Sequence, residues 1–192
     1  MLTRILIVLA VLVLLFIVAV ALRPSTFRIA RSATIAAPPE AVFMQVDDLR
    51  RFQEWSPWAK LDPGCKITFD GPAAGAGAAF SWSGNKRVGE GRMTLTGSRP
   101  PEFIVFEIEF LKPFKATNTA EFTFKPGGGQ TVVSWSMSGK CNFMAKAFGL
   151  FMNCDKMAGG DLEKGLAAMK SLAEEATKTA PAQSRLACSE PR

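Results

Sequence analysis

Histidine and tyrosine are both absent from this chain of 192 residues. Histidine is the commonest general base near neutral pH and the commonest side-chain ligand for metal ions. Its absence excludes most hydrolase and metalloenzyme mechanisms. The composition therefore predicts no metal site and offers no candidate catalytic residue.

Cysteine is scarce as well, and its four positions show no C-x-x-C spacing. Because protein zinc sites usually need such pairs or histidine partners, none is predicted. Buried free thiols are the simplest interpretation, while a disulfide such as Cys141 with Cys154 stays open if the domain is exported. The full set is Cys65, Cys141, Cys154 and Cys188.

A phosphate-binding loop is missing too. The glycine-rich segment 71–80 lacks the Gly-Lys-Ser/Thr ending of such a loop and precedes a strand pattern instead of a helix. We interpret this segment as a hairpin connection, and we expect no cofactor.

Basic residues are not concentrated in any run, although 23 lysines and arginines against 17 acidic residues give a net charge of +6. This scattering argues against nucleic acid as a partner. Four arginines instead flank an apolar N-terminus, where anionic lipid headgroups would attract them. These are Arg4, Arg23, Arg28 and Arg31. The sequence thus favours a membrane surface as a partner and is silent about protein partners.

An apolar run is the most prominent feature that the chain does have. Residues 5–22 carry no polar side chain, and a helix of this length just crosses the hydrocarbon core of a bilayer. We predict a transmembrane anchor over residues 1–25 and a single-pass membrane protein. A cleaved signal peptide is the alternative, because Ala19-Val20-Ala21 fits the small-x-small cleavage pattern.

The side of the membrane on which the rest of the chain lies is left open. Arg23, Arg28 and Arg31 outnumber Arg4, which by the positive-inside rule would keep the C-terminal part cytoplasmic. That argument fails if these arginines belong to a folded strand.

Beyond Pro24 the pattern changes to alternating and helical segments. Residues 26–38 predict a strand, and Pro38-Pro39 opens a short helix with a second turn near Asp48. Six segments between Lys66 and residue 139 alternate with a period of two and predict an antiparallel meander. Helical spacing returns after Asn142. We expect a break at Gly159-Gly160, a new helix capped by Asp161, and a disordered tail over residues 178–192.

Alternation also predicts which strand residues face inward. Glu107, Glu109, Glu121 and Arg92 fall on the polar face, where charges form ordinary cross-strand pairs. Asn118 is the one strongly polar residue on the apolar face. We expect its amide either to form a structural hydrogen bond to the helix or to contact the polar group of a ligand. The strands and the following helix supply the apolar candidates for a ligand site: Phe80, Trp82, Met93, Phe106, Ile108, Phe122, Trp135, Phe148, Phe151 and Met152.

This order of elements resembles the START-like or SRPBCC superfamily, and in particular its polyketide cyclase/dehydrase-like branch. The similar phrases are "SATIAAPPEAVF", "WSPW", "GEGRMT", "FLKPF" and the ending "GLFM…DKM…DLEKGLAAMK", which together cover about residues 26–175. The resemblance implies an α+β helix-grip domain over residues 26–177, with a curved antiparallel sheet around a long C-terminal helix. It also implies a deep apolar cavity for lipids, sterols, polyketides or similar molecules.

Within that arrangement, the segment from Arg51 to Pro63 closes one end of the cavity. Trp55 and Trp58 are then expected either to contact the ligand as cap and wall or simply to plug one end of the core. The leading functional hypothesis is a membrane-anchored module that binds a hydrophobic small molecule or lipid. A cyclase or dehydrase type enzyme, and a structural or partner-binding domain without a cavity, are the alternatives.

Overall fold

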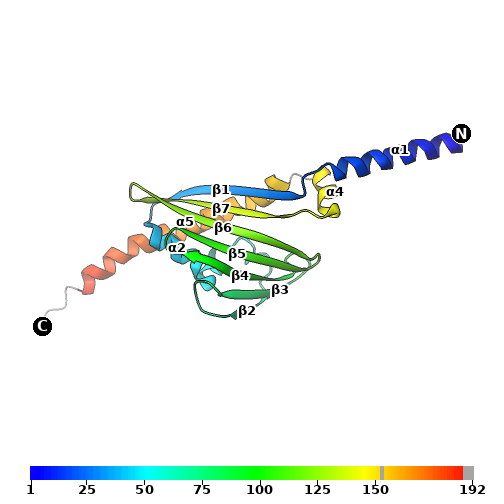
Figure 1. Cartoon of the computed structure of the whole chain (residues 1–192). Helices are drawn as coiled ribbons and strands as arrows, with labels where there is room; N and C mark the ends of the chain where they lie inside the picture. The colour runs from blue at the N-terminus through cyan, green and yellow to red at the C-terminus, as the bar shows by residue number, and fades with distance from the viewer. Residues whose placement is uncertain (152–153, 188–192) are drawn as a thin grey trace.

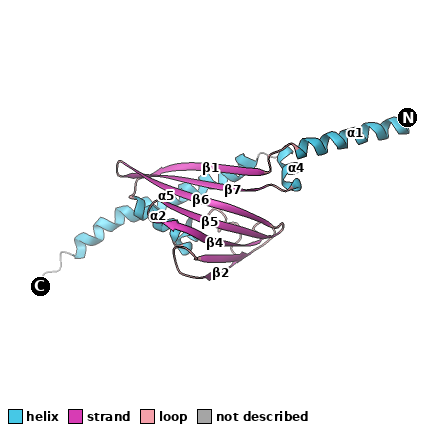
Figure 2. Ribbon diagram, in the orientation of Figure 1, coloured by secondary structure: helices cyan, strands magenta, loops and turns pink. Residues whose placement is uncertain are grey.

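A seven-stranded antiparallel sheet forms the body of the protein (Figures 1 and 2). The computed structural model describes residues 1–151 and 154–187, without the side chains of Phe148, Phe151, Cys154, Met157 and residues 180–187. The strand order across the sheet is β1-β7-β6-β5-β4-β3-β2, so β1 and β2 lie at the two edges. The strands are β1 (Thr26–Ile35), β2 (Lys66–Asp70), β3 (Ala79–Ser83), β4 (Glu90–Arg99), β5 (Phe103–Lys112), β6 (Ala116–Gly127) and β7 (Gln130–Lys140).

Helices α2 (Pro39–Asp47) and α3 (Leu49–Trp55) connect the first two strands. Pro39 occupies the first turn of α2, where its missing N–H costs nothing. Asp48 caps α3, because its Oδ1 accepts a hydrogen bond of 2.9 Å from the backbone N–H of Arg50. The predicted pair of short helices, with its junction at Asp48, is therefore confirmed.

The long helix α5 (Cys154–Ala187) packs across the inner face of the sheet, as in a helix-grip fold (Figure 2). Its buried residues Leu162, Leu166 and Met169 are at most 2% exposed. The predicted α+β class and the antiparallel meander are confirmed. The helix also continues to Ala187, beyond residue 178, where the sequence predicts a disordered tail. Residues 188–192 lie outside the described part.

The predicted break at Gly159-Gly160, with Asp161 as a cap, is wrong. Helix α5 runs through both glycines without interruption. Gly159 lies against the guanidinium of Arg31, and a Cβ at this position would overlap it. The Arg31 Nε donates a hydrogen bond of 2.6 Å to Glu163 Oε1. This glycine thus lets an arginine of β1 approach the helix, which is a tertiary requirement that local helix propensity does not reveal.

The register of the strands agrees with the predicted faces. On β5, Ile104, Phe106 and Ile108 are buried, whereas Glu107 and Glu109 at the alternate positions are exposed. On the outer face, Arg28 of β1 forms an ion pair of 3.7 Å with Glu121 of β6. Two of the arginines that entered the orientation argument, Arg28 and Arg31, therefore belong to a folded strand, and that argument is weakened accordingly.

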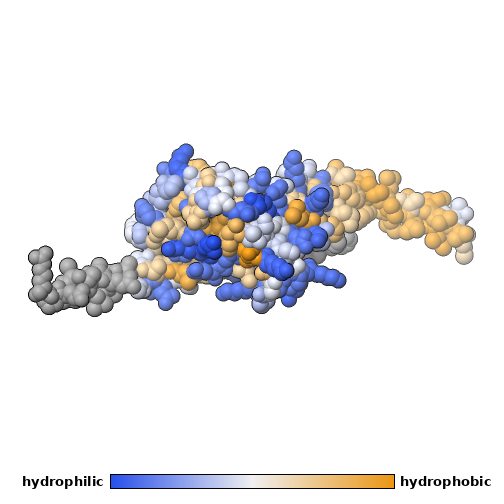
Figure 3. Space-filling view, turned by 90° about the horizontal axis from the view of Figure 1, so that it is seen from below, coloured by the Kyte–Doolittle hydropathy of each residue, from blue (hydrophilic) through white to orange (hydrophobic). Residues whose placement is uncertain are grey.

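The N-terminal helix α1 (Leu2–Ala21) projects away from this body (Figure 3). Its apolar side chains are exposed, and Val20 is the only buried residue in it. Near Val20, the short helix α4 (Phe143–Phe151) packs against α1 (Figure 1). Among the described residues, α1 is the one helix long and apolar enough to cross a bilayer, and a signal sequence would pass the same test.

Candidate functional site

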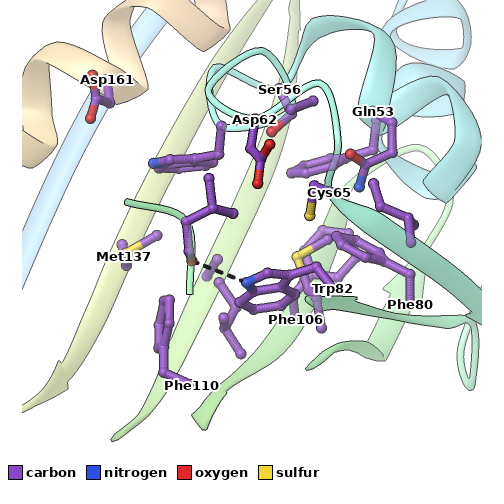
Figure 4. A pocket seen from close by; sticks show the side chains of 18 of the residues that line it. Gln53, Ser56, Asp62, Cys65, Phe80, Trp82, Phe106, Phe110, Met137 and Asp161 are labelled. Atoms are coloured by element: carbon purple, nitrogen blue, oxygen red, sulfur yellow. Dashed lines mark hydrogen bonds between the residues drawn. The ribbon is translucent and has the colours of Figure 1, made fainter. Parts of the chain in front are cut away.

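A cavity of about 530 Å³ lies between the inner face of the sheet, helix α3 with the loop after it, and helix α5 (Figure 4). The sheet contributes its floor with large apolar side chains such as Phe106 and Phe122. The loop after α3 contributes Trp58, and α5 contributes Ala158 and Asp161. The described side chains of this domain therefore do not fill its interior, in contrast to the hypothesis of a domain without a cavity.

Most of the predicted ligand-contacting residues come together in the wall of this cavity. Eight of them line it: Trp58, Phe80, Trp82, Met93, Phe106, Ile108, Phe122 and Trp135. Trp55 and Asn118 do not line it. The side chains of Phe148, Phe151 and Met152, which the sequence also nominates, lie outside the described part of the chain.

The two neighbouring tryptophans separate into different roles. Trp55 is 1% exposed and packs edge-to-face against Trp135 at a centroid distance of 5.6 Å, so it belongs to the packed core. Trp58 is half-buried and lines the cavity, where it packs edge-to-face against the same Trp135 at a centroid distance of 5.7 Å. One tryptophan is thus a core anchor and the other is a wall of the cavity.

Asn118 lies near the start of β6 and does not line the cavity, although its cross-strand partner Ile108 does. Its alternation phase is inward as expected, but it is half-buried and packs over Gly139 of the neighbouring strand. A Cβ on Gly139 would overlap the Asn118 amide. No described residue makes a hydrogen bond with the Asn118 side chain. Alternation predicts the face of this residue correctly, but it does not predict whether the side chain reaches the cavity.

Trp135 places an unpaired hydrogen-bond donor in the wall of the cavity. Its side chain is 1% exposed, and its indole N–H has no partner among the described residues. The indole N–H of Trp82, in comparison, donates to the carbonyl oxygen of Val88 at 3.3 Å (Figure 4). Buried donors are nearly always satisfied, so this unpaired N–H is unusual, although the nitrogen atom itself is not exposed to the cavity.

Several lining residues come from loops and were not predicted. The loop after α3 supplies Asp62, Pro63 and Cys65, and the β3–β4 turn supplies Arg87 and Val88. Such loops carry no hydrophobic periodicity, so the sequence offers no pattern to find them. Phe110 and Met137 also line the cavity. Both share the alternation phase of the buried residues Ile108 and Trp135 on their strands, so this pattern could have nominated them.

Two polar groups of this wall, Asp62 and Cys65, are poorly suited to act as a base or a nucleophile. Asp62 accepts backbone hydrogen bonds from Gly64 at 3.0 Å and from Asn85 at 2.7 Å, and it thereby ties the two loops together. Burial, and secondarily the nearby Asp62 carboxylate, raise the pKa of the Cys65 thiol above its usual range, which disfavours the nucleophilic thiolate. Within the described part of the chain, no group of three or more potential metal ligands is present.

The cavity is closed at one end of the sheet and open at the other. Phe106, Phe122 and Trp135 in its depth are at most 1% exposed. Toward the β3–β4 turn, Trp82 and Val88 are half-buried, as is Phe110 of β5, and Arg87 is exposed. We call this open end the mouth. The geometry supports binding of an apolar molecule that enters at the mouth and contacts aromatic side chains in the depth.

Comparison with known proteins identifies a matching family model and solved structures with a similar architecture. A family model described as "Polyketide cyclase / dehydrase and lipid transport" matches residues 26–174. No protein with a curated description matches the chain.

Solved structures with the same fold share little sequence with the chain. A protein from Chromobacterium violaceum is 16% identical, with a TM-score of 0.55 over 79% of this chain and 99% of its own. The protein Ara h 8.0201 is 11% identical, with a TM-score of 0.53 over 77% and 97%. The di-domain ARO/CYC protein StfQ from the steffimycin biosynthetic pathway is 13% identical, with a TM-score of 0.56 over 78% of this chain and 51% of its own. At these identities the similarity shows the fold alone.

Proposed function

The chain belongs to the polyketide cyclase/dehydrase and lipid transport family, and on this premise we propose that it is a membrane-anchored module that binds one hydrophobic small molecule or lipid. In this proposal residues 1–25 are the anchor and residues 26–177 are the binding domain. The observation that carries it is the cavity of about 530 Å³ between sheet and helix. Its volume falls in the range of about 300–1,000 Å³ that is typical of small-molecule sites.

The wall of the cavity defines the chemistry of the ligand. Aromatic and aliphatic side chains form nearly all of its depth, so most of the ligand should be apolar. In this proposal an acceptor on the ligand, such as a carbonyl, carboxylate or hydroxyl oxygen, pairs with the indole N–H of Trp135, which has no described partner, once the side chains of the wall adjust. An amphiphile such as a fatty acid or a lipid with one polar group fits both conditions.

An enzyme of the cyclase or dehydrase type is the second candidate. It is favoured by walls that would exclude water from a reactive substrate. Its weakness is the lack of a free acid or base in the described depth, because Asp62 is engaged by two backbone donors, Asp161 is paired with Lys164 at 3.1 Å, and Arg87 lies at the mouth. A ligand that leaves the protein chemically unchanged supports the binding module over the enzyme.

Titration with cis-parinaric acid, a fluorescent long-chain fatty acid, tests the proposal. The full chain in mild detergent should show saturable energy transfer from tryptophan to the probe. Ala120 lines the cavity and is 2% exposed, so Ala120→Trp should fill the cavity and abolish the saturable signal. Thr119→Trp is the matched control, because Thr119 is exposed on the opposite face of the same strand. Equal binding by both variants would contradict the cavity as the site.

A further inference from the structure

Exposed apolar side chains gather at the end of the domain where α1 joins it. Phe114 and Leu111, at the β5–β6 turn, are 71% and 51% exposed. Phe143 and Met144, at the start of α4, are 50% and 57% exposed. We call these four residues the apolar rim. Large side chains exposed together in this way usually mark a surface that contacts another body.

The strand register places the two halves of the rim at the same end of the sheet. Phe110 pairs with Ala116, and Gly139 pairs with Asn118, so the β5–β6 turn lies beside the end of β7. Lys140 in turn pairs with Thr26, the first residue of β1. Figure 1 shows the β5–β6 turn, α4 and the C-terminal end of α1 at this end.

Cationic side chains lie at the same end of the sheet as the apolar rim. Six lysines and arginines belong to the turns, strand ends and α4 at this end: Lys86, Arg87, Lys112, Lys115, Lys140 and Lys146. Lys112 is paired with Glu90 at 3.0 Å, and no ion pair joins the other five to a described residue. Exposed apolar side chains together with positive charge at one end of the domain match the interface of a bilayer with anionic headgroups.

The mouth of the cavity opens at this same end. Arg87 and Val88 line the cavity and also form the β3–β4 turn, which lies against Lys112, since a Cβ on Gly89 would overlap the Lys112 carbonyl group. Phe110 lines the cavity, while the next residue, Leu111, is part of the apolar rim. The route into the cavity therefore begins at the β3–β4 turn, beside the end of β5 that carries Leu111 of the rim.

We propose that this end of the domain docks on the anionic bilayer that α1 enters, with the mouth facing the lipid. This inference rests on the proposed membrane attachment through α1. Residues 22–25 join α1 to β1, and four residues span about 14 Å at most, so the rim stays close to the membrane surface. A ligand can then pass between bilayer and cavity without crossing water. The ligand class that follows is a lipid or lipid-soluble amphiphile taken from that membrane.

Collisional quenching by lipids tests this docking. The full chain is reconstituted into liposomes of phosphatidylcholine and phosphatidylglycerol whose acyl chains carry bromine, and the fluorescence of Phe114→Trp is compared with wild type. Gln130→Trp is the matched control, because Gln130 is exposed in the β6–β7 turn at the opposite end of the sheet. We expect the additional emission at residue 114 to be blue-shifted and quenched severalfold more than that at residue 130.

A second set of measurements separates quenching caused by docking on lipid from quenching with other causes. Combining Phe114→Trp with Lys115→Glu and Lys146→Glu should weaken the quenching, and liposomes of phosphatidylcholine alone should do the same. Equal quenching of the tryptophans at residues 114 and 130 would overturn the proposal. So would the absence of any quenching of the tryptophan at residue 114 by brominated lipid. Cross-linking would then show whether a second copy of this chain covers the rim. Because the rim does not line the cavity, parinaric acid binding measured on the same variants reports independently on the proposed function.

Discussion

The indole N–H of Trp55 donates a hydrogen bond of 2.8 Å to the backbone carbonyl of Gln45. This bond ties α3 to α2 and holds the ring in the core, where its other neighbours are Phe52 and Trp135. Trp58, three residues later, lines the cavity instead. The two tryptophans therefore allow stability and ligand binding to be tested separately.

Trp55→Phe should destabilise the domain by about 2–4 kcal/mol, because it removes the donor to Gln45 and leaves a void in the core. Trp58→Phe should change the free energy of unfolding by less than about 1 kcal/mol, since the residue is half-buried. Its effect should appear as weaker binding of parinaric acid. Urea unfolding and ligand titration of both variants would check this division. A Trp58→Phe protein that loses stability but keeps full affinity would contradict it.

The adjacent glycines of α5 should respond oppositely to alanine. Gly160 has open space around its Cα, so Gly160→Ala should stabilise the helix by about 0.5–1 kcal/mol. Gly159→Ala should destabilise by about 1 kcal/mol, because the new methyl group displaces the Arg31 guanidinium. In an Arg31→Ala background, both substitutions should stabilise. If Gly159→Ala still destabilises there, a contact other than Arg31 is responsible.

Glu107→Gln and Glu109→Gln should leave ligand affinity unchanged within about twofold. Both side chains are exposed on the outer face of β5, whereas Phe106 and Ile108 between and beside them line the cavity. Measured parinaric acid affinities of the two variants would check this. A large loss of affinity with an intact circular dichroism spectrum would mean that the strand register is shifted by one residue.

Acid should weaken the contact between α5 and the end of β1 through Glu174. Its Oε1 accepts a hydrogen bond of 2.8 Å from the backbone N–H of Ala36, and this bond together with nearby Lys170 lowers the pKa of Glu174 below its usual value of 4.5. The carboxylate therefore stabilises the folded state above the unfolded-state pKa, and this contribution is lost as the pH falls through the lower folded-state pKa.

Glu174→Gln should accordingly cost stability at neutral pH, and the difference from wild type should shrink below about pH 4.5. Chemical unfolding at a series of pH values would measure this. Glu175→Gln is the control, because Glu175 is exposed on the same helix. A constant difference between Glu174→Gln and wild type at every pH would contradict the assignment.

The sheet could be predicted from the sequence because alternation reports directly on which face a residue occupies, as Phe106 and Glu107 show. The loops that line the cavity could not be predicted from the sequence, because residues such as Asp62 and Arg87 reach the cavity only through tertiary packing. The continuity of α5 was missed for the same reason, because the contact of Gly159 with Arg31 joins residues far apart in the chain. Alternation also cannot predict whether an inward-facing residue such as Asn118 lines the cavity.

Residues 1–25 should remain in the mature protein. The helix α1 is apolar and exposed along its length, so retention would place the protein in the membrane fraction. Cell fractionation followed by N-terminal sequencing would check this. A soluble mature protein that begins near Leu22 would instead identify α1 as a cleaved signal peptide.

Native mass spectrometry tests the central claim, a ligand-binding cavity, most directly. The full chain, extracted gently from membranes and released from detergent in the instrument, should carry one non-covalently bound hydrophobic molecule that dissociates intact on activation. Ala120→Trp should abolish this additional mass, and Thr119→Trp should retain it. A wild-type protein that appears only at its own mass, even after incubation with membrane lipid extract, would contradict the account.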